Sequence, residues 1–374
     1  MKSTLTILLT FITIFLNAQT THIHCGKLID GKSDKVMKEM TIIIEGKVIQ
    51  DVKKGYTNPP QGTEIIDLKN ETVLPGLMDM HVHLESIYDH NVYLNRFIMN
   101  EADIAYRSVG FANITLMSGF TTVRDLGGSG VNVSLQKAIA RGYVAGPRMY
   151  TAAKSIAITG GHADPTNGAK KDLFDYPGPD QGVADGVDEC RKAVRQQVKN
   201  GADLIKITAT GGVLSVARDG KRPQFTLEEI QAIVETANDF GIKVAAHAHG
   251  DEGMRRAVEG GVASIEHGTM MSEETMDLMI KKGTYYVPTI TAGWSVADSA
   301  KIEGYFPEVV RPKALEIGPK IQGTFTKAYK RGVKIAFGTD AGVFPHGKNA
   351  LEFQYMVEGG MKPMETIKAA TMEA

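Results

Sequence analysis

The pattern of hydrophobic and polar positions divides the chain into three parts. Residues 5–16 form one apolar run, and residues 20–75 hold short alternating runs separated by Gly, Asn and Pro, which is typical of β-strands and turns. From residue 76 to residue 374, apolar runs alternate with stretches whose apolar positions recur at the helical period. We therefore expect the N-terminal part of a small flanking β-sandwich domain at 20–75, followed by an α/β domain at 76–374.

Eight strands are expected in the α/β domain, at 77–83, 121–126, 148–152, 204–208, 244–249, 263–266, 285–289 and 335–339. Helical patterns lie between them, for example at 227–240, 252–260, 273–282 and 314–330. Strands that alternate with helices form a parallel sheet, and eight such units suit a closed (β/α)8 barrel of the TIM type. The Gly-, Pro- and Asp-rich stretch at 160–187 is expected to be a long loop.

The N-terminal residues 1–19 are expected to be a secretory signal peptide. Lys2 precedes the apolar run at 5–16, and small and polar residues follow at 17–20, which is the usual order of such signals. A buried strand or an uncleaved anchor is the alternative, although the run is shorter than the ~20 apolar residues of a membrane span. We expect a bacterial protein that is exported to the periplasm or beyond, with no stable membrane insertion after signal removal.

Composition and charge exclude several classes of protein. The chain has 374 residues, of which 43% are hydrophobic, so it can bury a large core. Lys and Arg number 42 against 43 Asp and Glu, and the resulting net charge of -1 offers no attraction for nucleic acid. Two cysteines, Cys25 and Cys190, are too few for a disulfide scaffold. A small-molecule partner is expected, and formation of a homo-oligomer is left open.

The first two barrel strands end in residues that carry chemistry. His81 and His83 stand at i and i+2 on the first strand, so both imidazoles point to the same face and can hold one metal ion. The alternative is a pair of histidines whose nitrogens bond to the backbone. At the end of the second strand, Arg124 and Asp125 are expected to form a structural ion pair rather than a clamp for substrate.

Four later strands add candidates of the same kind. Lys206 lies inside an apolar run, where burial favours the neutral amine, unless a carboxylate pairs with it. His247 and His267 lie on the fifth and sixth strands, and Asp340 follows the eighth. Active sites of barrels lie at the C-terminal ends of the strands, so these side chains are expected to converge.

In this order, the residues resemble the amidohydrolase superfamily, particularly the imidazolonepropionase-like amidohydrolases and the Xaa-Pro dipeptidase-like metal-dependent hydrolases. The resemblance implies two divalent metal ions, with zinc the first choice, bridged by Lys206 in its N6-carboxylated form. It also implies that Asp340 is catalytic and takes a proton from the attacking water. The implied metal ligands are His81, His83, Lys206, His247, His267 and Asp340.

Three further residues are candidates for contact with substrate. His249 lies two residues beyond His247 on the same face, so it is either at the mouth of the site or merely solvated. His162, in the loop after the third strand, resembles a substrate-side motif of the family, although most loop histidines have no such role. Tyr286, near the end of the seventh strand, is a candidate for binding a substrate carboxylate, with packing as the alternative.

The expected reaction is hydrolysis of a C–N amide bond, in a dipeptide or an N-acyl amino acid, by a water activated between two metal ions. Hydrolysis of a cyclic amide, an ester or a lactone is the alternative, and a non-catalytic exported barrel that binds metal or ligand is a second one. The chain ends within what resembles the last barrel helix, whereas relatives continue with strands that complete the small β-domain. The small β-domain is therefore expected to be truncated at the C-terminus, and whether the sequence is a fragment is left open.

Overall fold

The computed structural model describes residues 20–217 and 219–374, so the predicted signal peptide at 1–19 lies outside the described residues. The chain divides into two compact units between Pro75 and Gly76. Within the described ranges, none of the helices has the length and apolar character that crossing a membrane requires. The two units are described separately.

The first unit contains a single four-stranded sheet in the order β3-β2-β1-β4. Its strands are β1 (Thr20–Leu28), β2 (Met37–Glu45), β3 (Val48–Lys54) and β4 (Glu64–Val73). The first strand pairs antiparallel with β2 and parallel with β4. A small core of Cys25, Leu28, Met40 and Ile42 is buried in this unit. Its assignment to a β-sandwich domain stays a prediction.

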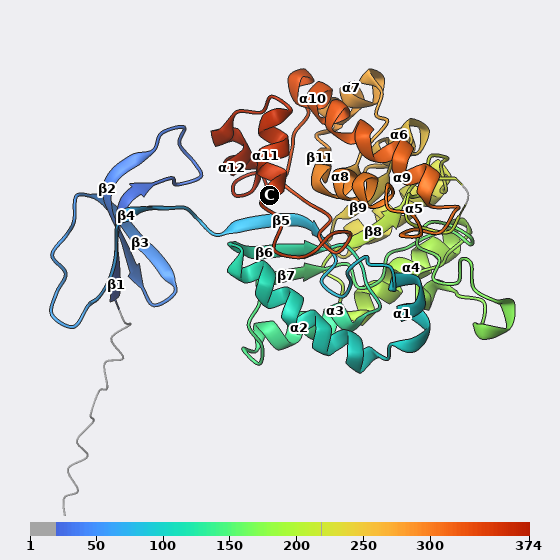
Figure 1. The fold of residues 1–374 in the computed structure, drawn as a ribbon, viewed down its shortest axis with the longest axis horizontal. Coiled ribbons are helices and arrows are strands. Elements are labelled where there is room, and N and C mark those ends of the chain that lie inside the picture. The colour runs from blue at the N-terminus through green and yellow to red at the C-terminus, as the bar shows by residue number, and fades with distance from the viewer. Residues whose placement is uncertain (1–19, 218) are drawn as a thin grey trace, which may run out of the picture. The chain divides into compact units, whose positions relative to one another are not determined.

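The second unit is built on parallel strands, which Figure 1 shows surrounded by helices. The strands are β5 (Leu77–Val82), β6 (Phe120–Asp125), β7 (Arg148–Thr151), β8 (Ile205–Thr208), β9 (Val244–Ala248), β10 (Ser264–His267) and β11 (Tyr285–Val287). They form two parallel sheets, β5-β6-β7 and β8-β9-β10-β11. Single parallel bridges join these sheets: Ile156 pairs with Ile207, Tyr286 with Ile335, and Val82 with Ala341.

These bridges close the ring in chain order, with residues 335–341 in the eighth position, so the predicted (β/α)8 barrel of the TIM type is confirmed. The predicted eighth strand at 335–339 forms only one ladder bridge. At its end, Thr339 donates its main-chain N–H and its hydroxyl to the buried carboxylate of Asp79, at 3.1 and 2.7 Å.

The helices are α1 (Val92–Ile98), α2 (Glu101–Met117), α3 (Val131–Ala140), α4 (Gly186–Asn200), α5 (Leu227–Asp239), α6 (Asp251–Gly260), α7 (Glu273–Lys282), α8 (Ile290–Ser299), α9 (Arg311–Ile317), α10 (Ile321–Arg331), α11 (Leu351–Glu358) and α12 (Pro363–Ala369), with 3₁₀ turns at Lys171–Leu173, Pro179–Gln181 and Gly318–Lys320. Their boundaries follow local chemistry. In α5, Thr226 and Glu229 form a capping box, and Ile230, Ile233 and Ala237 are buried on one face.

Two sequence expectations for the helical layer need correction. The helix predicted at 314–330 is divided into α9 and α10 by the 3₁₀ turn at Gly318–Lys320. Pro319 lacks a donor for a continuous helix, and a side chain at Gly318 would collide with the carbonyl of Gly293. The loop predicted at 160–187 contains two short 3₁₀ turns, and α4 already begins at Gly186.

Candidate active site

The candidate active site is a cavity of about 280 Å³. All six predicted metal ligands line it, although they come from strands spread over much of the barrel domain. His81 lies in β5, Lys206 in β8, His247 in β9 and His267 at the end of β10. The arrangement follows from the fold, because parallel strands bring their C-terminal ends to one rim of the barrel.

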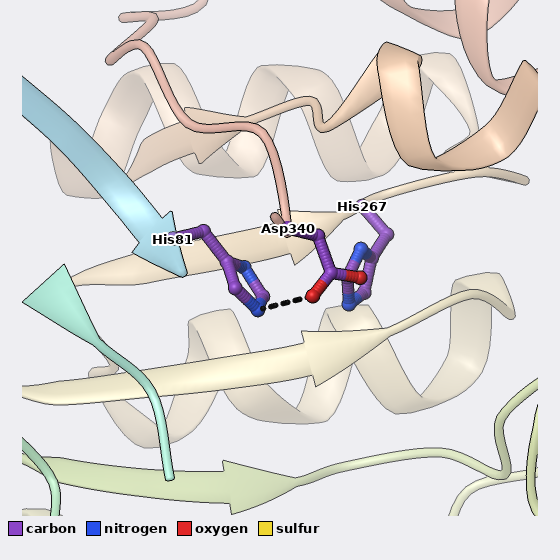
Figure 2. Close-up of side chains that lie close together, drawn as sticks. All are labelled: His81, His267 and Asp340. Carbon is purple, nitrogen blue, oxygen red and sulfur yellow. Dashed lines mark ion pairs between the residues drawn. The ribbon is translucent and has the colours of Figure 1, made fainter. Parts of the chain in front are cut away.

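A group of three buried residues has the geometry of a metal site. One nitrogen each from His81 and His267 and one carboxylate oxygen from Asp340 lie within 4.8 Å of one another. Figure 2 shows the three side chains converging, with the His81 ring pointing at the Asp340 carboxylate. Oδ1 of Asp340 is 3.4 Å from Nε2 of His81 and 3.4 Å from Nε2 of His83.

This Oδ1 is the strongest sign that the site holds a cation. It is buried and has no hydrogen-bond partner among the residues that the structure describes, although a buried oxygen without one costs about 1–3 kcal/mol. A divalent metal ion ligated by imidazole nitrogens and this carboxylate would satisfy it. The residues present therefore fit a metal ion of the kind that the family resemblance implies.

The two histidines of the first strand are held in the orientation that metal binding needs. Nδ1 of His81 donates to Oε2 of Glu266 at 2.9 Å, and Nδ1 of His83 donates to the carbonyl of Gly127 at 2.7 Å. Both bonds place the ring proton on Nδ1, so Nε2 carries a free lone pair next to Asp340.

The histidines of the fifth and sixth strands are fixed in the same manner. Nδ1 of His267 lies 2.8 Å from the hydroxyl of Thr289, which leaves Nε2 as its second ring nitrogen. Nε2 of His247 donates to the carbonyl of Gly211 at 3.2 Å, so Nδ1 is its remaining ligand atom. The two rings are 4.7 Å apart between centroids.

Three residues of the site have a backbone conformation that side chains other than glycine rarely adopt. His267, Thr289 and Asp340 have φ angles of 71°, 52° and 61°. Left-handed conformations of this kind cost roughly 1–3 kcal/mol each and persist where the surrounding structure enforces them. Their concentration at one cavity indicates that the fold aims these side chains at a fixed point.

Burial moves the charged groups of the cavity toward their neutral forms. It lowers the pKa of the Lys206 amine, opposed by the carboxylates of Glu266 and Asp340, and it raises the pKa of Asp340, opposed by Lys206. Burial also lowers the pKa of His83 to about 4, so this imidazole is neutral at pH 7 and can bind a metal ion. Nζ of Lys206 lies 3.4 Å from Nε2 of His81.

Two of the three predicted substrate-side residues also line the cavity. The ring of His162 stacks on His247 at 4.3 Å, and within the described part of the chain its buried Nδ1 has no hydrogen-bond partner. Nδ1 of His249 lies 2.8 Å from the hydroxyl of Thr269. The structure does not bring Tyr286 to the cavity: the side chain is fully buried, and its hydroxyl donates to the carbonyl of His267 at 2.9 Å.

The predicted ion pair between Arg124 and Asp125 is wrong. Consecutive side chains of a strand point to opposite faces, so the two cannot meet. Arg124 instead donates to Oε1 of Glu266 at 2.7 Å, and Asp125 accepts the N–H of Leu84 at 2.8 Å. Glu266, which sequence reasoning missed, therefore links Arg124 to His81. Its available signal was a carboxylate inside a buried strand, one residue before His267.

Comparisons with known proteins show the family of the chain. A sequence model described as the amidohydrolase family matches residues 72–374. The ochratoxinase of Aspergillus niger is 34% identical over 384 aligned residues, covering 96% of this chain and 76% of that protein. A crystal structure of a Xaa-Pro dipeptidase with bound methionine in the active site is 56% identical, with a TM-score of 0.93 and coverage of 95% and 87%. A prolidase complexed with N-methylphosphonate-L-proline is 30% identical, with a TM-score of 0.84 and coverage of 94% and 85%.

Proposed function

The chain belongs to the amidohydrolase family and is a hydrolase that acts on carbon–nitrogen bonds, and we propose that it cleaves the amide bond of dipeptides or N-acyl amino acids. One observation carries the proposal: a buried, unbonded carboxylate oxygen of Asp340 lies beside two neutral imidazoles in a cavity of substrate size. The similar Xaa-Pro dipeptidase and prolidase support a substrate of this class.

We infer that the site takes two divalent metal ions, with zinc the first choice because imidazole and carboxylate ligands suit it. Such ions, when bound, polarise the scissile carbonyl and lower the pKa of the attacking water. The residues that would hold them are His81, His83, Lys206, His247, His267 and Asp340.

Lys206 is proposed to bind as its N6-carboxylated form. Burial lowers the pKa of its amine, so the neutral amine that can attack carbon dioxide is accessible near neutral pH. The new N–C bond forms as one N–H proton leaves, and the product is an anionic carbamate. Carboxylation would replace the buried ammonium of Lys206 with an anion among the neutral imidazoles. A negatively charged ligand of this kind attracts divalent metal ions.

The chain's own residues then carry the protons. Asp340 accepts a proton from the attacking water and returns it to the nitrogen of the leaving amine, acting first as general base and then as general acid. Burial supports this role, because it raises the pKa of the carboxyl above its usual range. His162, with its unpartnered Nδ1, and His249 are placed to contact the substrate beside these groups.

Localisation is proposed from the sequence. The apolar run at 5–16 after Lys2 supports a signal peptide, and hence a mature protein that works in the periplasm or outside the cell. Detection of the mature N-terminus near residue 20 in a periplasmic or culture fraction would support export. Recovery of the intact chain in the cytoplasm would contradict it.

The function is tested with a mixed panel of dipeptides and N-acyl amino acids, from which zinc-loaded protein should release free amino acid. Asp340→Asn should keep the circular dichroism spectrum and lose turnover by roughly 10²–10⁴-fold, because an amide cannot accept the proton. Asp298→Asn is the matched control, since Asp298 is exposed and forms a surface ion pair with Lys301.

The possible outcomes separate the hypotheses. Comparable turnover in Asp340→Asn would remove this residue from its role. A folded, metal-loaded protein that cleaves nothing in the panel would contradict the proposed substrate class. Cyclic amides, esters and lactones would then be assayed, and inactivity there as well would favour a barrel that binds without catalysis.

A further inference from the structure

One wall of the cavity is formed by the loop that follows β8. Val213, Leu214 and Ser215 of this loop line the cavity, and Val213 and Leu214 are 8% and 7% exposed. The same two side chains pack in a hydrophobic cluster with Val296 of α8 and Ile317 of α9. The loop thus forms a continuous surface with two helices that follow it in the barrel.

A buried lysine holds this loop by its main chain. Nζ of Lys313, in α9, donates to the carbonyls of Gly212, Ser215 and Ala217 at 3.1, 2.7 and 2.6 Å. An ammonium group has three protons, so all of its donor capacity is directed at one short loop. We refer to these three hydrogen bonds as the Lys313 clamp.

Burial of the Lys313 ammonium costs free energy, which these hydrogen bonds to the loop offset. The conformation of the loop therefore depends on the clamp. Lys313 is only 8% exposed, and burial lowers the pKa of its amine to about 8, against the opposing effect of Asp219. A buried ammonium is stable only when its protons are bonded, and loss of the lysine would leave three carbonyls to find other donors. One further tether, from the hydroxyl of Tyr93 to the carbonyl of Leu214 at 2.8 Å, restrains the same loop.

The surface that the clamp holds in place is aliphatic. The apolar residues that this part of the cavity presents are Val213, Leu214, Val296, Ile317, Ile321 and Val343. A surface of this composition favours an aliphatic side chain, because the area that it offers for burial is apolar. Among the ionisable lining residues, Tyr88 packs against the same cluster and the ring of His162 lies against Gly212, at the edge of this surface.

We propose that Lys313 is a positioning residue for specificity: by clamping residues 212–217 it shapes a subsite that selects substrates with an aliphatic side chain. This inference rests on the proposed function and deepens it. Lys313 does not line the cavity, so it acts through Val213 and Leu214 rather than by touching the substrate.

The test uses Lys313→Met, which keeps an unbranched apolar chain and removes the ammonium. The zinc-loaded enzyme is assayed with pairs of substrates that differ only in having leucine or glycine at one position, and their kcat/KM values are compared. The leucine-to-glycine ratio of kcat/KM is expected to fall about tenfold or more, within the ~10–200-fold range of discrimination that apolar pockets provide. The fall should come from a higher KM for the leucine substrate, with kcat within about twofold and metal content unchanged.

Lys320→Met is the matched control. Lys320 lies in the turn after α9, is half exposed and pairs with Glu316 on the surface, so its loss should leave the ratio unchanged. Leu214→Ala removes the wall without removing the clamp and should lower the ratio in the same direction. It keeps the test valid if Lys313→Met fails to fold.

A second readout needs no substrate. Trypsin cleavage after Lys221, which lies at the end of the loop and pairs with Glu316, should be faster in Lys313→Met than in the parent or in Lys320→Met. An unchanged cleavage rate would overturn the clamp. Faster cleavage with an unchanged leucine-to-glycine ratio, or an unchanged ratio in Leu214→Ala, would overturn the specificity role. A parent enzyme that cleaves no dipeptide or N-acyl amino acid would contradict the proposed function, while the proteolysis result would still decide the clamp.

Discussion

Replacement of Glu266 by glutamine tests whether a carboxylate that never touches the cavity controls metal binding. Oε2 of Glu266 accepts the Nδ1 proton of His81 at 2.9 Å, and Oε1 accepts from Arg124 and from the hydroxyl of Ser264 at 2.7 and 2.5 Å. Both oxygens therefore accept hydrogen bonds, one from His81 and two from the side of Arg124 and Ser264. Glutamine has nearly the same shape but only one oxygen.

Either orientation of the glutamine amide weakens the site. If its NH2 group faces His81, the imidazole must accept that proton at Nδ1, and its own proton moves to Nε2, the proposed ligand atom. If the NH2 group faces Arg124, two donors oppose each other and the partly buried guanidinium loses its 2.7 Å ion pair. Loss of a charge-assisted hydrogen bond costs about 1.5–3 kcal/mol, and loss of the partner that orients a ligating histidine weakens metal binding about 10–100-fold.

The assay is a zinc titration of metal-free protein in the presence of a competing chelator, which reports affinity without reference to turnover. Glu266→Gln should bind zinc about 10–100-fold more weakly than the parent, with its far-ultraviolet circular dichroism retained. Glu259→Gln, which breaks a surface pair with Arg255 on α6, is the matched control. Equal zinc affinity in Glu266→Gln and the parent would refute the reasoning, and so would an equal loss in the control.

Two further predictions concern metal and pH. Removal of metal by a chelator should abolish turnover, and added zinc should restore it, because Asp340 alone cannot polarise the substrate carbonyl. Rate and metal content are measured on the same samples. Activity that survives in verified metal-free protein would contradict the inferred cofactor. Burial raises the pKa of Glu352 in the folded chain to about 7, from an ordinary value of 4.5. The folded state therefore binds this proton more tightly than the unfolded state does. As a result, the contribution of Glu352 to the free energy of unfolding falls as the pH rises from about 4.5 to about 7. The advantage of the parent over Glu352→Gln in urea unfolding should therefore shrink by up to roughly 3 kcal/mol between pH 4.5 and pH 8, and a difference that is independent of pH would show that the shift is absent.

The positions of the proposed metal ligands could be predicted from the sequence, because they depend only on where each strand ends. Strands alternate with helices, their C-terminal ends meet at one rim, and residues such as His81 and Asp340 stand where each strand ends. The partners of those ligands could not be predicted in this way. The contact between Glu266 and Arg124 joins β10 to β6, and it depends on which residues of distant strands face the barrel interior at the same height.

Tyr286 shows that the position of a residue along a strand does not predict where its side chain points. Its place near the end of a strand made it a candidate for substrate binding, but the residue is in β11, where its side chain is buried and bonds to the carbonyl of His267. A strand end determines where a residue lies along the barrel axis. Whether the side chain turns toward the cavity depends on the alternation within that strand, which a three-residue strand such as β11 is too short to reveal.

Buried carboxylates that lie outside the cavity explain how the strained site is held. Asp79 accepts the N–H of His81 and both the N–H and the hydroxyl of Thr339, so one side chain fixes the first strand against the segment that ends in Asp340. Glu352 accepts the N–H groups of Ile290 and Thr291 at 2.8 Å, and so caps α8 directly after Thr289. Asp79 binds Thr339, which directly precedes Asp340, and Glu352 binds Ile290, which directly follows Thr289. Asp340 and Thr289 are the residues of positive φ. The unfavourable backbone at the cavity is thus offset by hydrogen bonds immediately behind it, which is why substitution of these carboxylates should disturb the site before it unfolds the barrel.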